Sequence, residues 1–166
     1  MNIKNDRGYI YIETLITIVI IGIIFAASAT IGRNFFLNTM AEYEATKLIS
    51  SIRYVQELNR NSYIVREGEF EQIEPEKSTT FRVTVSDYFY QIKSTNDKFE
   101  PRTYKTIKNV TLSENQPFNG GIHFYTDGTP KTFGTIQVKS TFGKNTASRY
   151  VIIDKAGRIR MDRNPP

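Results

Sequence analysis

Residues 7–13 read RGYIYIE, and they lead directly into an uncharged stretch, residues 14–32, which reads TLITIVIIGIIFAASATIG. Because an α-helix rises about 1.5 Å per residue, this stretch makes a helix about 28 Å long, close to the ~30 Å hydrocarbon core of a bilayer. Its apolar side chains occur all around the helix rather than on one face, so the helix needs apolar surroundings on every side. We therefore predict a transmembrane and assembly helix at residues 9–33.

The charges that flank this segment predict how it is inserted. Lys4 and Arg7 precede it, and Arg33 is the first charge after it. A basic leader holds the N-terminus in the cytoplasm and sends the remainder across, which predicts a single-pass protein of the cytoplasmic (inner) membrane. Glu13 is unusual in such a segment. A carboxylate is costly at the membrane centre but not at its rim, and the first turn of a helix favours a negative charge.

Three other interpretations of the same stretch are open. A secretory signal peptide has a basic start, an apolar centre and a small-residue cleavage site, which residues 27–29 (ASA) provide, although its apolar centre is usually only 7–15 residues long. A plain membrane anchor explains the length but not the glycine and the glutamate. A core helix buried in protein is the third alternative. The first two imply a secreted or membrane-anchored, β-rich extracellular binding module.

The segments GYIYIETLI (residues 8–16) and IIGII (residues 20–24) resemble the class III signal of type IV pilins and pseudopilins. The resemblance implies that residues 1–8 are a leader, that a prepilin peptidase cuts after Gly8 and N-methylates Tyr9, and that Glu13 serves filament assembly. It also implies other pilin subunits as partners and a place on the pilus or cell surface after assembly. Tyr9 departs from the phenylalanine that is usual at that position.

A physical role for Glu13 follows from this resemblance. When the helices leave the lipid and pack into a fibre, the Glu13 carboxylate loses water and needs a partner, since an unpaired buried charge is costly. Cleavage frees the α-amine of Tyr9, which titrates near pH 8 and so is mostly cationic at neutral pH. We hypothesise that Glu13 pairs with the Tyr9 amine of a neighbouring subunit, so that proteolysis permits assembly.

Beyond Arg33 the helical pattern continues, and we predict an amphipathic helix over residues 34–62. Apolar residues recur at steps of mostly three and four: Phe36, Met40, Tyr43, Leu48, Ile52 and Val55. Charged residues are expected on the other side: Glu42, Glu44, Lys47, Arg53 and Glu57. One long helix from about residue 9 to about residue 61 is expected, and two helices broken near Gly32 are the alternative.

Residues 63–166 are predicted to form a β-rich head. Residues 66–80 hold five glutamates at a spacing that fits no EF-hand, so we expect a solvated loop rather than a calcium site. Seven short strands follow: residues 81–85, 88–92, 106–112, 121–125, 135–139, 149–153 and 158–161. The predicted fold class is α+β, with a long N-terminal helix packed by its second half against a C-terminal antiparallel β-sheet domain.

The order of residues 122–128, 134–138, 150–153 and 157–160 resembles the C-terminal half of the GspH/FimT class of minor pilins, which includes the competence pseudopilin ComGD. The resemblance implies a minor subunit of a fibre for DNA uptake or for type II protein secretion. Residues 157–160, GRIR, resemble the GRxR motif with which some FimT-like pilins bind DNA. In a strand, Arg158 and Arg160 share one face, and Ile159 and Met161 are expected to face the core.

The C-terminal region is also basic, with eight basic and two acidic residues from Lys131 to the end of the chain. Such a surface predicts weak, salt-sensitive binding to the phosphates of double-stranded DNA, with a dissociation constant of about 10⁻⁴ to 10⁻⁶ M. The candidate residues are Arg149, Lys155, Arg158, Arg160 and Arg163. The alternative is a strand edge kept soluble by its charges.

Nothing in the sequence points to catalysis, a metal or a cofactor. The chain has no cysteine, so it offers neither disulfides nor thiolate ligands. It has no HExxH, GxSxG or P-loop motif. We expect the single histidine, His123, to be structural, and Asp127 and Asp154 to be turn residues. The expected partners are the other pilin subunits, the prepilin peptidase, the cytoplasmic membrane and double-stranded DNA.

Overall fold

The computed structural model describes residues 6–61, 81–95, 99–115, 118 and 120–166. The start of the predicted leader and the predicted acidic loop at residues 66–80 lie outside these residues. The chain divides into two compact units, Met1–Phe36 and Leu37–Pro166, which are described separately.

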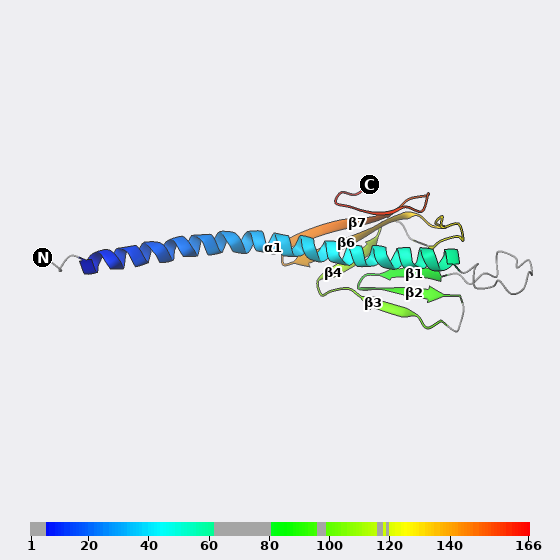
Figure 1. Cartoon of the computed structure of the whole chain (residues 1–166), viewed down its shortest axis with the longest axis horizontal. Coiled ribbons are helices and arrows are strands. Elements are labelled where there is room, and N and C mark those ends of the chain that lie inside the picture. Colours follow the sequence, from blue (N-terminus) through cyan, green and yellow to red (C-terminus); the bar gives the residue numbers. More distant parts are fainter. Residues whose placement is uncertain (1–5, 62–80, 96–98, 116–117, 119) are drawn as a thin grey trace, which may run out of the picture. The chain divides into compact units, whose positions relative to one another are not determined.

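The helix α1 runs without a break from Asp6 to Asn61 (Figure 1). It begins three residues before the predicted start and ends at the predicted residue. Gly32 lies inside it, so the alternative of two separate helices is wrong. No proline occurs in this stretch, and a single glycine lowers helix stability by only about 1 kcal/mol, too little to break so long a helix.

In the first unit, every described side chain of α1 from Tyr9 to Phe36 is exposed. An 18-residue window of this helix has a mean hydropathy of 2.5, and none of that window is buried. By length and composition the helix is therefore a candidate membrane span, as the sequence predicts.

In the second unit, one face of α1 is buried: Leu37, Ala41, Glu44, Ala45, Leu48, Ile49, Ile52, Val55 and Asn59. This face differs from the predicted one, because Phe36 and Tyr43 are more than half exposed. Two alanines, Ala41 and Ala45, lie on the buried face instead, and both are completely buried. The prediction that Glu44 lies on the polar side is wrong, since its side chain is almost completely buried.

The β-rich part contains eight described strands in two four-stranded antiparallel sheets. One sheet has the order β3 (Arg102–Lys105), β2 (Phe89–Ser94), β1 (Phe81–Ser86) and β5 (Ile122–His123). The other has the order β4 (Val110–Glu114), β6 (Gly134–Phe142), β7 (Asn145–Ile153) and β8 (Ile159–Asp162). The prediction of seven strands and one sheet is therefore corrected to eight and two, and β3 is the strand that the sequence pattern missed.

Residues 106–109 were predicted to be the start of a strand and instead form a loop. The backbone N–H of Ile107 donates to the carboxylate of Glu44 on α1, at 3.0 Å, and so does not join a ladder. Asn109 has a positive φ of 71°, which a strand does not accommodate. The ladder between β4 and β6 starts only at Val110.

Both sheets and the buried face of α1 contribute side chains to one hydrophobic core. Leu48, Ile52 and Val55 from the helix lie in it with Val83 and Ile92 from the first sheet. The second sheet adds its own inward side chains: Val110, Leu112, Ile136, Val138, Val151, Ile153 and Ile159. The predicted α+β class, with the helix packed against antiparallel strands, is confirmed.

Candidate functional site

The predicted processing and assembly residues lie at the start of α1. Tyr9 and Glu13 are both exposed, and Tyr9 is 78% accessible. The backbone carbonyl of Glu13 accepts a hydrogen bond from the Thr17 hydroxyl at 2.7 Å. Among the described residues, no cation forms an ion pair with the Glu13 carboxylate. Within the part of the chain that the structure describes, the Glu13 carboxylate thus has no ion-pair partner and is exposed to its surroundings.

The peptide bond between Gly8 and Tyr9 lies in the first turn of α1, which starts at Asp6. A protease needs this segment in an open conformation. Because the first four N–H groups of a helix have no partner within it, its first turn unwinds at little cost, and a glycine there weakens it further. The backbone at Gly8 is therefore compatible with cleavage.

The basic C-terminal residues divide into exposed and buried ones. Lys155, Arg158, Arg160 and Arg163 are exposed around β8. Arg158 is not a free charge: its Nε lies 3.1 Å from Asp154, whose other oxygen accepts the backbone N–H groups of Ala156 and Arg158. These hydrogen bonds, foremost that from the Arg158 backbone, lower the pKa of Asp154. The ammonium of Lys155 lies 5.0 Å from the centre of the Phe133 ring.

Arg149 does not belong to this exposed group. Arg149 pairs with Val138 on β6, and this register turns the arginine side chain toward α1. The residue is only 5% exposed there. There the guanidinium lies 3.3 Å from the carboxylate of Glu42 and 3.2 Å from the side-chain oxygen of Asn38. Arg149 therefore fastens β7 to the helix and offers no charge to a ligand.

The side chains at residues 158–161 alternate as expected, with one difference. Arg158 and Arg160 are exposed on either side of Ile159, which is buried. Met161 pairs with the buried Val151 but remains 36% exposed. Among the described strands, β8 is at the edge of its sheet, so no further strand pairs with it beside Met161.

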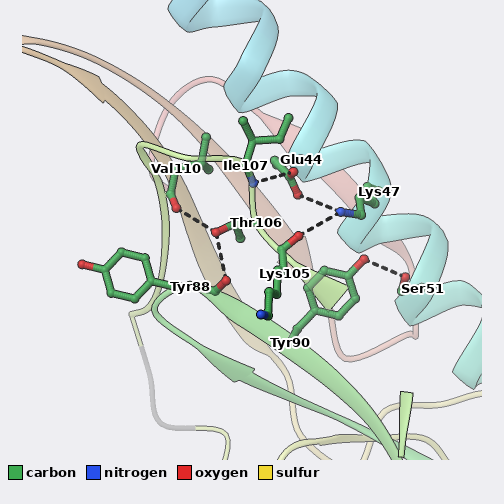
Figure 2. A network of polar contacts seen from close by, with 9 residues as sticks. All are labelled: Glu44, Lys47, Ser51, Tyr88, Tyr90, Lys105, Thr106, Ile107 and Val110. Atoms are coloured by element: carbon green, nitrogen blue, oxygen red, sulfur yellow. Dashed lines mark hydrogen bonds and ion pairs between the residues drawn. The ribbon is translucent and has the colours of Figure 1, made fainter. Parts of the chain in front are cut away.

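Around Glu44 a network of polar contacts joins α1 to the loop before β4 (Figure 2). One carboxylate oxygen accepts the N–H of Ile107, and the other lies 3.6 Å from the ammonium of Lys47. Lys47 in turn donates to the backbone oxygen of Lys105 at 3.2 Å. The hydroxyl of Thr106 lies 3.0 Å from the backbone oxygens of Tyr88 and Val110. Residues 105–109 are therefore held by side chains to the helix, to the turn that carries Tyr88 and to the start of β4.

An open hollow of about 720 Å³ lies beside this loop. Its lining residues come from the turn before β2, the end of β3 and the loop after it, β4, the end of β6 and the turn after it: Tyr88, Lys105, Thr106, Ile107, Lys108, Asn109, Thr111, Thr141, Phe142 and Gly143. Two of them are lysines and none is acidic. No pattern in the sequence reveals this hollow, because its lining residues are far apart along the chain.

The remaining candidate residues behave as structural ones. His123 Nε2 lies 3.1 Å from the backbone oxygen of Gly120, and burial, with Arg82 and Lys131 nearby, lowers its pKa. Asp127 accepts the N–H and the hydroxyl of Thr129 at 2.8 and 2.6 Å, as expected of a turn residue. In the part of the chain that the structure describes, no group of three or more acidic, histidine or cysteine side chains is arranged to hold a metal ion.

Comparison with known proteins gives no assignment: no family profile, no curated protein and no solved structure matches this chain.

Proposed function

We propose that this protein is a minor type IV pilin or pseudopilin, cut after Gly8 and N-methylated at Tyr9, that joins a fibre for DNA uptake or for type II protein secretion. The observation that carries the proposal is Glu13. It is a carboxylate without an ion-pair partner among the described residues, near the start of a helix whose side chains from Tyr9 to Phe36 are all exposed. Such a helix requires lipid or other helices around it, and the carboxylate requires a cation once water is removed.

Proteolysis supplies that cation in the proposed mechanism. Before the cut, the nitrogen of Tyr9 is a neutral amide that follows a charged leader. After it, the α-amine is mostly protonated at neutral pH and is located at the start of the apolar helix. Glu13 of one subunit then pairs with the amine of Tyr9 on its neighbour, and the apolar side chains of residues 14–32 pack against those of adjacent subunits.

The test is incorporation of Glu13→Ala into fibres, in cells that make the fibre and the prepilin peptidase. We expect normal cleavage but an incorporation lower by about a hundredfold or more, because the buried amine of the neighbour loses its partner. Glu57→Ala is the matched control, since Glu57 is an exposed glutamate in the second unit of the same helix. Incorporation of Glu13→Ala at the level of this control would refute the proposed role.

We further propose that the exposed arginines around β8 bind the phosphates of DNA weakly. Arg160 supports this best, because it is exposed and has no acidic partner within ion-pair distance among the described residues. Arg158 contributes only in competition with Asp154. In mobility-shift titrations at two salt concentrations, Arg158→Ala with Arg160→Ala should weaken binding and flatten its salt dependence by about one unit per lost phosphate contact. Lys105→Ala with Lys108→Ala removes the same charge from the end of β3 and the loop after it, away from β8, and serves as the control; equal effects would refute the assignment.

A further inference from the structure

We propose that the hollow beside residues 105–109 is a docking surface for the anionic lipid headgroups of the membrane that residues 9–33 span. This inference uses the membrane insertion in the proposed function, but neither the cleavage nor the polymerisation. It assigns a role to a part of the head that the pilin resemblance does not cover.

The lining of the hollow has the chemistry of a membrane-surface site. Lys105 and Lys108 are exposed beside Tyr88, Ile107 and Phe142, and these three apolar or aromatic side chains are between 37% and 66% accessible. Lysines that reach an anionic surface gain electrostatic energy, and aromatic rings favour the boundary between headgroups and hydrocarbon. No lining residue is acidic. A zwitterionic or cationic surface offers these lysines no such gain.

The position of the hollow within the second unit agrees with this occupant. The second unit begins at Leu37, and the candidate span directly precedes it in the chain. Glu44, which holds the N–H of Ile107, follows Leu37 by seven residues, about 10 Å along the helix. The hollow thus lies beside the part of α1 with which the second unit begins. The C-terminal end of α1 contacts a different part of this unit, since Asn59 forms hydrogen bonds with Phe81 at the start of β1.

The loop that forms one wall is fixed in place before any lipid arrives. Glu44 holds Ile107, and Lys47 donates to the backbone oxygen of Lys105, so the loop is fastened at two points (Figure 2). The Thr106 hydroxyl fastens it to the turn that carries Tyr88. A preformed surface binds without first paying the entropy of ordering its loop.

The experiment uses the absence of tryptophan from this chain, which lets a single introduced residue report on its surroundings. Phe142→Trp places the reporter in the hollow, and Phe133→Trp places it just before the opposite end of β6, roughly 25–30 Å away. The full chain is reconstituted into vesicles of phosphatidylcholine alone and of equimolar phosphatidylcholine and phosphatidylglycerol. Vesicle flotation checks insertion, and quenching of the fluorescence by brominated lipids checks docking.

We expect the tryptophan at position 142 to be quenched in the anionic vesicles only, and to lose that quenching in about 1 M salt, where the Debye length is about 3 Å. The tryptophan at position 133 should stay unquenched. Lys105→Gln with Lys108→Gln should reduce the docked fraction roughly fivefold for each lysine. Lys131→Gln with Lys155→Gln carries the same charge change near the other end of β6 and should leave docking intact.

Four outcomes would overturn the inference. Flotation without composition-dependent quenching at position 142 refutes the docking but leaves membrane insertion standing. Equal quenching at position 142 in neutral and in anionic vesicles shows that the contact does not depend on anionic headgroups. An equal loss of docking in the Lys105/Lys108 and the Lys131/Lys155 double variants shows that it does not depend on this hollow. Failure to float with either kind of vesicle refutes the inference together with the membrane insertion on which it rests.

Discussion

Arg149 lies on β7 with its guanidinium turned toward α1, in contact with Glu42 and Asn38. The sequence alone grouped it with the exposed arginines, because composition cannot show which face of a strand a residue occupies. The ladder between β6 and β7 decides this, since a register shift of one residue would turn Arg149 to the opposite face. A buried arginine of this kind serves stability rather than ligand binding.

We therefore predict that Arg149→Ala lowers the free energy of unfolding by about 2–3 kcal/mol, because it removes buried charge-assisted hydrogen bonds and leaves a cavity. Arg160→Ala, at an exposed site, should change it by less than about 0.5 kcal/mol. Urea unfolding of the purified full chain in detergent, followed by circular dichroism, measures both. Equal effects of the two substitutions would contradict the buried position of Arg149.

His123 supplies a prediction about pH. Burial, and to a smaller extent the charges of Arg82 and Lys131, lowers its pKa below the ordinary 6.5, while the hydrogen bond with Gly120 opposes this. The unfolded chain therefore binds a proton more readily than the folded one, so the stability due to neutral His123 is present above pH 6.5 and is lost as the pH falls through the folded-state pKa.

In urea unfolding at about pH 7.5 and pH 5.5, the parent should lose more stability on acidification than His123→Gln does. The pKa of Glu114 is raised by burial and so favours folding at low pH, but it is common to both proteins and cancels in the comparison. An identical pH dependence for the two proteins would refute a role for His123 in this effect.

At the scale of elements, the turns at residues 125–128 and 154–157 contact each other and also α1. Gly128 and Gly157 both have positive φ angles, and the side-chain amide of Gln56 donates to the backbone oxygens of both, at 2.7 and 3.0 Å. A Cβ on Gly157 would lie 2.5 Å from the carbonyl oxygen of Gly128, a backbone atom that cannot turn aside as the end of a flexible side chain can. Gly143 also has a positive φ, but nothing lies within 4 Å of its Cβ position.

Because Gly143 and Gly157 share a positive φ and differ in the space around their Cβ positions, their substitution by alanine gives a matched comparison. Gly143→Ala should cost about 1–2 kcal/mol, the strain of a left-handed backbone at an alanine. Gly157→Ala should cost clearly more, about 3 kcal/mol or above, because the clash with Gly128 adds to the same strain. The midpoints of thermal unfolding of the two variants give the comparison. A smaller loss for Gly157→Ala than for Gly143→Ala would show that the two turns are not in contact as described.

Elements with strong local patterns were predicted well, and those that depend on distant partners were not. The long helix and the hairpin of β1 and β2 follow from periodicity and turn residues in the sequence. β3 has only four residues and no apolar alternation, so its strand geometry comes from its pairing with β2. Residues 106–109 continue the sequence pattern of a strand. However, the N–H of Ile107 donates its hydrogen bond to the carboxylate of Glu44, more than sixty positions earlier in the chain, and not to another strand.

At the scale of the whole molecule, the sequence was sufficient for the α+β class and for the candidate membrane span. It was not sufficient for the two-sheet arrangement, because strand order depends on pairings between segments that have no pattern in common. The candidate site divides in the same way. Tyr9 and Glu13 could be proposed from the sequence because the whole motif lies in one short segment, whereas the hollow near Ile107 is assembled from three separate segments.

The mass of the mature N-terminal peptide tests the central claim most directly. The protein is purified from cells that contain the prepilin peptidase, and from otherwise identical cells that lack it, and its N-terminal peptide is analysed by mass spectrometry. The account predicts N-methylated Tyr9 as the first residue in the former and the uncut leader in the latter. A protein that begins at Thr30 in both, as cleavage by a secretory signal peptidase after residues 27–29 would give, contradicts it.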